Sequence, residues 1–148
     1  MSGCTPGAGR KAGLVVAIGV DIIKTSRFEK LLRTKTTSFA ERLSKRILHH
    51  THELPKFNEM DAGRQVQFMA GSWAAKEALF KTLHQEEQDV FNFNEWYRYN
   101  NSSGKPFISN DKYDYNNEEF HLSISHDDSL VIATVLRQKL YSLDSKGL

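Results

Sequence analysis

The chain has 148 residues, a length typical of one domain with a single core. Its 20 Lys+Arg against 18 Asp+Glu leave a net charge of only +2, which excludes strong overall attraction to nucleic acid. The single cysteine, Cys4, excludes a disulfide within the chain. The apolar run Leu14–Val20 is too short for a transmembrane segment.

The N-terminal residues 1–13 include Arg10 and Lys11, no acidic residue and several small residues. We expect a flexible tail here, with a degenerate organelle-targeting segment as the alternative. Residues 14–148 then form the folded domain. For localisation we favour the mitochondrion over the cytoplasm.

The first half of the domain begins with an apolar, largely β-branched segment. Leu14–Ile23 predicts a buried strand that ends near Asp21. Thr25 or Ser26 can cap the helix that follows. A second amphipathic helix or turn is expected over Phe39–Leu48.

The strongest helical pattern covers Gln65–Leu83, because large apolar residues recur on one side at the spacing of a helix. Beyond it, shorter segments suit strands separated by polar turns: Glu95–Tyr99, Lys105–Ile108, His121–His126 and Leu130–Leu136. This order of elements predicts an α+β fold, in which an antiparallel sheet packs against one long helix.

The histidine-rich segment His49-His50-Thr51-His52 allows a metal site or a solvated helix end. The histidines lack the i, i+4 spacing that places two ligands on one helix face. The segment also follows a predicted helix directly. We therefore favour the helix end.

Two charged residues of the long helix, Glu77 and Lys81, are four positions apart and so share one face. Taken alone, this pair predicts a surface salt bridge. Lys76, however, lies among apolar positions, where a charge requires a partner or a ligand. Three neighbouring alanines leave room for a close approach to the helix.

Asp21 presents a similar choice, since a carboxylate beside a buried strand needs a cap, a cation or a metal ion. Mg²⁺ typically takes one or two carboxylates together with substrate phosphate oxygens. Asp21 and Glu77 suit such a site, with Lys81 beside a departing phosphate.

Ser125 and His126 end an alternating strand, where a polar edge is the simpler interpretation.

Four segments occur in a fixed order between Val15 and Leu136: Gly19-Val20-Asp21, Phe68–Lys81, Gly104-Lys105-Pro106 and Ser123–His126. Together they resemble the holo-acyl-carrier-protein synthase family of 4′-phosphopantetheinyl transferases, including fungal mitochondrial members. The most specific signal is Trp73-Ala74-Ala75-Lys76-Glu77-Ala78 with its following lysine.

The resemblance implies transfer of the phosphopantetheine arm from coenzyme A to a serine of an acyl carrier protein, a step that supports fatty acid biosynthesis. It implies Mg²⁺ held by Asp21 and Glu77, with Glu77 or a metal-bound water accepting the serine proton and Lys81 steadying the leaving phosphate. Contacts with coenzyme A are implied for six residues: Lys76, Lys81, Lys105, Pro106, Ser125 and His126.

The resemblance also implies partners and an assembly. The helix after Asp21 would dock the acidic carrier protein, with Arg27 as the first candidate contact and Lys24 and Lys30 as further ones. A homotrimer with active sites between subunits is implied.

The sequence departs from the family pattern at two places. Ser72 stands where many members have an arginine, and Thr82-Leu83-His84-Gln85 replaces a glycine-containing loop after Lys81. Two other functions therefore stay open. One is a metal-dependent pyrophosphate or nucleotide hydrolase that uses the same carboxylates, and the other is a non-catalytic subunit that binds carrier protein.

Overall fold

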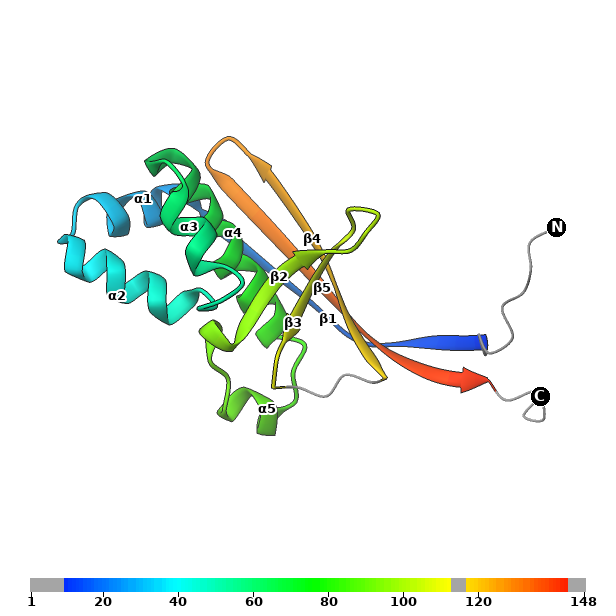
Figure 1. The fold of residues 1–148 in the computed structure, drawn as a ribbon. Coiled ribbons are helices and arrows are strands. Elements are labelled where there is room, and N and C mark those ends of the chain that lie inside the picture. The colour runs from blue at the N-terminus through cyan, green and yellow to red at the C-terminus, as the bar shows by residue number, and fades with distance from the viewer. Residues whose placement is uncertain (1–9, 113–116, 144–148) are drawn as a thin grey trace.

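The computed structural model describes residues 10–112 and 117–143, which form one antiparallel sheet packed against helices (Figure 1). The strands are β1 (Arg10–Lys24), β2 (Trp96–Asn100), β3 (Pro106–Asn110), β4 (Glu118–Asp127) and β5 (Leu130–Leu143). The helices are α1 (Thr25–Arg33), α2 (Thr37–Ile47), α3 (Leu54–Glu59), α4 (Ala62–Phe80), α5 (Gln85–Asp89) and the 3₁₀ turn η1 (Phe93–Glu95). The predicted α+β class with a long helix against the sheet is confirmed.

The strand order across the sheet is β1-β5-β4-β3-β2, and every neighbouring pair is antiparallel. The longest pairing joins the first and last strands, from Arg10 opposite Leu143 to Lys24 opposite Leu130. Its outer end extends away from the body as a two-stranded ribbon (Figure 1). The chain's first strand is thus held in place by its last one.

Several element bounds differ from the sequence-based expectations. Residues 10–13, expected in the tail, belong to β1, and β5 continues seven residues beyond Leu136. Backbone hydrogen bonds between paired strands do not require apolar side chains, so the hydrophobic pattern underestimates both strands. Residues 1–9, the rest of the expected tail, lie outside the described part. The short helices α3 and α5 have too few turns to produce a periodic pattern.

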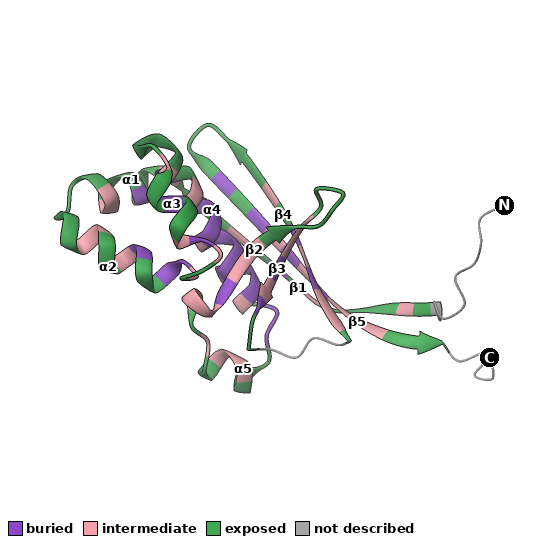
Figure 2. Ribbon diagram, in the orientation of Figure 1, coloured by how far each residue is buried: buried purple, intermediate pink, exposed green. Residues whose placement is uncertain are grey.

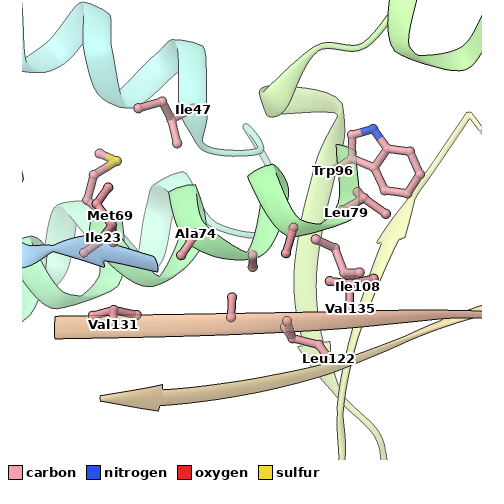
Figure 3. Close-up of a cluster of buried hydrophobic side chains, with 14 of the residues drawn as sticks. Ile23, Ile47, Met69, Ala74, Leu79, Trp96, Ile108, Leu122, Val131 and Val135 are labelled. Atoms are coloured by element: carbon pink, nitrogen blue, oxygen red, sulfur yellow. The ribbon is translucent and has the colours of Figure 1, made fainter. Parts of the chain in front are cut away.

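Helix α4 forms the centre of the core. Ala70, Ala74, Ala75 and Ala78 are fully buried, and these small side chains let the helix lie close to the sheet. Figure 3 shows α4 between Ile47 on one side and the β5 residues Val131 and Val135 on the other. No helix in the described residues is long and apolar enough to cross a membrane.

One face of β1 is exposed, which contradicts the prediction of a buried strand. Gly19 and Ile23 face α4 and are buried, whereas Ile18 and Ile22 on the opposite face are 66% and 57% exposed. The exposed stretches of β1 are visible in Figure 2. The helices cover only one face of this strand, so its apolar residues on the other face have no covering layer within residues 10–112 and 117–143.

Candidate functional site

Asp21 reaches the long helix because β1 packs closely against the end of α4. A Cβ atom at Gly19 would overlap the backbone carbonyl oxygen of Ala78, so only glycine permits this approach. Beyond this contact, the Lys81 ammonium donates to the carbonyl oxygen of Val20 at 2.7 Å and to Asp21 Oδ1 at 3.4 Å. The lysine thus connects the strand to the helix end.

Glu77 shares this environment, since it lies one helical turn before Lys81. Partial burial raises the pKa of the Glu77 carboxyl, and the nearby negative charge of Asp21 raises it further. The positive charges of Lys81 and Arg27 act in the opposite direction. Two carboxylates, Asp21 and Glu77, and two cations, Lys81 and Arg27, therefore lie near one another at the surface.

Helix α1 places Arg27 beside this group. Its guanidinium lies 5.3 Å from the ring centroid of Trp73, which in turn stacks on Phe93 at 4.7 Å. The helix is not capped as predicted, because its N-cap residue is Lys24 and makes no side-chain cap bond. Thr25 instead bonds the carbonyl oxygen of Ser129 through its backbone N–H at 2.8 Å, which fixes the helix to the β4–β5 turn.

Lys76 faces away from this group and is fully buried. Its ammonium donates to the Glu53 carboxylate and to the carbonyl oxygen of Ile47, both at 2.5 Å. Burial is the main effect on its pKa, which falls to about 8. This placement does not fit the predicted contact with coenzyme A, because Glu53 supplies the partner that the charge requires.

The other predicted contacts lie elsewhere on the chain. His126 lines a cavity of about 720 Å³ over the first half of α4, and Ser125 is exposed on the same strand. Lys105 is exposed at the β2–β3 turn, next to the partly buried Pro106. Neither Lys105 nor Pro106 lines this cavity, so one chain does not bring the predicted residues into a single cluster.

Two arginines in the same cavity were not predicted from the sequence. Arg64 and Arg98 line it together with His126 and the apolar residues Phe68 and Ile124. Arg64 lies in the first turn of α4, a position that the predicted helix start at Gln65 leaves out. Arg98 lies on β2, so only the folded chain brings it to the helix.

The structure also gathers His49, His52 and Asp111, whose potential ligand atoms lie within 4.8 Å of one another. His49 Nδ1 accepts backbone N–H bonds from Thr51 and His52 at 3.1 and 3.2 Å. The neutral ring therefore has its proton on Nε2, which donates to Asp111 at 3.0 Å. This tautomer favours a hydrogen-bonded tie over metal ligation. The His49 side chain is only 12% exposed, so it is not the solvated helix end expected from the sequence.

Comparison with known proteins supports one family. Residues 17–135 match the model of the 4′-phosphopantetheinyl transferase superfamily. The holo-acyl-carrier-protein synthase of Oceanobacillus iheyensis is 36% identical over 123 residues, which cover 83% of this chain and 96% of that protein. The enzyme of the same name from Anoxybacillus flavithermus is 32% identical over 129 residues, or 87% of this chain and all of that protein.

A solved structure extends this similarity to three dimensions. The holo-acyl-carrier-protein synthase of Bacillus anthracis, determined in complex with coenzyme A (3′,5′-ADP), has a TM-score of 0.65 and 29% identity. The match covers 84% of this chain and 97% of that one. The family-model match over residues 17–135 includes Asp21, Glu77, Lys81 and the cavity residues. The chain therefore belongs to the 4′-phosphopantetheinyl transferase superfamily, with the holo-acyl-carrier-protein synthases as its relatives.

Proposed function

We propose that this chain transfers the 4′-phosphopantetheine arm of coenzyme A to a serine of an acyl carrier protein and releases adenosine 3′,5′-bisphosphate. The observation that carries the proposal is the meeting of Asp21, Glu77 and Lys81. A strand and a helix far apart in the sequence bring them together in a chain that spans nearly the full length of its synthase relatives.

We propose Asp21 and Glu77 as ligands of Mg²⁺. The donor set fits, since two neighbouring carboxylates supply the hard oxygen ligands that Mg²⁺ takes, and substrate oxygens and waters would complete the shell. Burial is the main cause of the raised pKa of Glu77, and the charge of Asp21 adds to it. A bound cation would relieve the repulsion between the two carboxylates. When bound, the ion would neutralise charge on the pyrophosphate of coenzyme A.

The reaction forms a bond from the serine oxygen to the phosphorus that carries the pantetheine arm, and it breaks the bond from that phosphorus to the bridging oxygen. We propose that Glu77 accepts the serine proton. The half-exposed ammonium of Lys81 donates to the departing phosphate oxygen.

We assign the nucleotide end of coenzyme A to the cavity lined by His126. Its apolar wall suits a base and ribose, and its basic residues suit a phosphate. Lys105 and Pro106 lie apart from Glu77 within one chain. We therefore propose that they act in the site of a neighbouring subunit.

A homotrimer is part of this proposal. The uncovered face of the sheet pairs Ile18 with Leu136 and Ile22 with Ile132, side by side across β1 and β5. Contiguous apolar residues on an open sheet face indicate a protein interface.

We propose that the carrier protein docks in the groove between β1 and α1, which has a volume of about 650 Å³. Lys24, Arg27 and Lys30 line it together with Ile22 and Leu31, which suits an acidic helix with an apolar edge. Arg27 is also close enough to affect the charge on Glu77.

We further propose a role in mitochondrial fatty acid biosynthesis, which rests on the composition of residues 1–13.

The deciding experiment incubates the protein with coenzyme A, apo-carrier protein and Mg²⁺, and follows the mass of the carrier. We expect the carrier to gain the phosphopantetheine mass, and EDTA to abolish the gain. Cleavage of coenzyme A without a gain in mass would indicate the hydrolase instead.

The matched variants are Glu77→Gln and Glu86→Gln, the latter at an exposed site on α5. Glu77→Gln should lower the rate about 10²- to 10⁴-fold, the usual contribution of a general base, while the protein stays folded. Glu86→Gln should keep the wild-type rate. A normal rate for Glu77→Gln would instead exclude Glu77 as the general base.

A further inference from the structure

Arg98 extends from β2 over the first half of α4, where three contacts hold its guanidinium. Nη2 donates to Ser72 Oγ at 2.9 Å and to the carbonyl oxygen of Phe68 at 3.3 Å. The guanidinium carbon lies 4.8 Å from the centroid of the Phe68 ring. The arginine is therefore held in one orientation before any ligand binds.

The other terminal nitrogen of Arg98, Nη1, lies beside Gly71, and both residues line the cavity. Nη1 lies 3.4 Å from the position that a Cβ atom on Gly71 would occupy. The guanidinium therefore packs over the helix backbone at this glycine. Gly71 and Arg98 both line the cavity of about 720 Å³, and the arginine side chain is 22% exposed. Among the described residues, Nη1 has no recorded hydrogen-bond acceptor.

The charges beneath the cavity do not balance. Glu53 is a buried carboxylate that Lys76 and Arg98 share: it lies 2.5 Å from Lys76 Nζ and 4.0 Å from Arg98 Nε. Arg98 Nε is buried without a hydrogen-bond partner in the described part of the chain. Two cations for one carboxylate leave a net positive charge, which an anion in the cavity would offset.

The rest of the cavity indicates what kind of anion. Arg64 and His126 add basic groups, and the N-terminus of the 19-residue helix α4 adds the positive end of its dipole. Phe68, Ile124 and Val131 form an apolar wall. Asp61 also lines the cavity, but its side chain is 71% exposed and caps the helix through the N–H of Arg64.

We propose that Arg98 binds the phosphate on the ribose of coenzyme A and makes the enzyme specific for that phosphate. This inference rests on the proposed function, which supplies the donor. The reacting pyrophosphate must lie at Asp21 and Glu77, whereas Arg98 contacts α4 five to nine residues before Glu77, roughly 10 Å along the axis.

The experiment compares coenzyme A with 3′-dephospho-coenzyme A in wild type, Arg98→Gln, Arg98→Lys and Arg42→Gln. Arg98→Gln should raise the KM for coenzyme A about ten- to a hundredfold, as expected for a charged hydrogen bond, and leave kcat within about threefold. Its KM for 3′-dephospho-coenzyme A should stay within about twofold. Arg98→Lys keeps the charge and should raise only the KM for coenzyme A, by a smaller factor.

The exposed Arg42 on α2 is the control, and its variant should resemble wild type with both donors. An equal rise in KM for both donors, or no rise for either, would overturn the role of Arg98. Calorimetric titration with adenosine 3′,5′-bisphosphate gives a second test that needs no turnover: Arg98→Gln should bind it at least about tenfold more weakly. If wild type fails to transfer the arm, the proposed function fails, and this titration still decides on Arg98.

Discussion

At the scale of single residues, α4 places two adjacent charges in opposite surroundings. Glu77 is partly exposed beside Asp21 and Lys81, where solvent and neighbouring cations keep a carboxylate available for chemistry. Lys76, the preceding residue, points into the core and pairs with Glu53. Consecutive helical residues differ by about 100° in direction, so one motif contains both a reactive group and a structural one.

The structural role of Lys76 can be tested through stability. Lys76→Met leaves the Glu53 carboxylate without its main partner, and we expect a loss of about 3–5 kcal/mol in the free energy of unfolding, measured by urea denaturation. The KM for coenzyme A should change little in the folded variant. Unchanged stability together with a large rise in this KM would instead support the contact predicted from the sequence.

Lys76 also predicts a pH dependence. Its pKa is about 8 in the folded chain, against the ordinary lysine value of 10.5, so between these values the unfolded chain binds more protons. The contribution of Lys76 to stability should therefore rise with pH across this window. Lys76→Met lacks this rise, so its stability deficit relative to wild type should grow from about pH 8 to 10.5. A deficit that shrinks with pH would contradict the assignment.

At the scale of elements, the site depends on how closely β1 approaches α4. The approach is possible because Gly19 has no side chain where the carbonyl of Ala78 lies. Lys81 then fixes the strand to the helix end through Val20 and Asp21. A strand and a helix that each form for local reasons are thereby joined into one catalytic group.

Gly19→Ala should separate these two elements. The new methyl group overlaps backbone rather than a movable side chain, so we expect a loss of about 1–3 kcal/mol in stability and a large fall in transfer rate. Thermal unfolding and the carrier assay measure both effects. The matched control is Gly13→Ala on the same strand, where the new Cβ meets only the flexible end of Gln138. Equal effects of the two variants would contradict this account.

At the scale of the whole molecule, the sheet has one covered and one uncovered face. The helices bury one face of β1 and β5, and the other presents Ile18, Val20, Ile22 and Ile132 to solvent. An exposed edge strand with an apolar face invites association. The proposed trimer would give this face a partner.

Ile18→Lys tests the assembly, because Ile18 is 66% exposed and a lysine there leaves the single chain intact. We expect light scattering after gel filtration to show a trimer for wild type and a monomer for the variant, with loss of transfer. The control is Val90→Lys, an equally exposed apolar residue next to α5, which should remain trimeric. A wild-type chain that elutes as a monomer would rule out the trimer.

The sequence by itself determined the family, the α+β class, the long helix and the candidate catalytic set of Asp21, Glu77 and Lys81. These features are encoded locally, by side-chain periodicity and by short motifs in a fixed order. The same local signals predicted a buried β1 and missed its exposed face, because an apolar position does not reveal whether this chain or another one covers it.

Only the tertiary structure decided which distant residues meet. It gave Lys76 its partner Glu53, 23 positions earlier, and brought Arg98 to Ser72, 26 positions away. It also made His126, Arg64 and Arg98 neighbours in one cavity, although they belong to different elements. No local pattern contains these contacts, since they depend on how helices and strands pack once they have formed, and packing is set by the whole core.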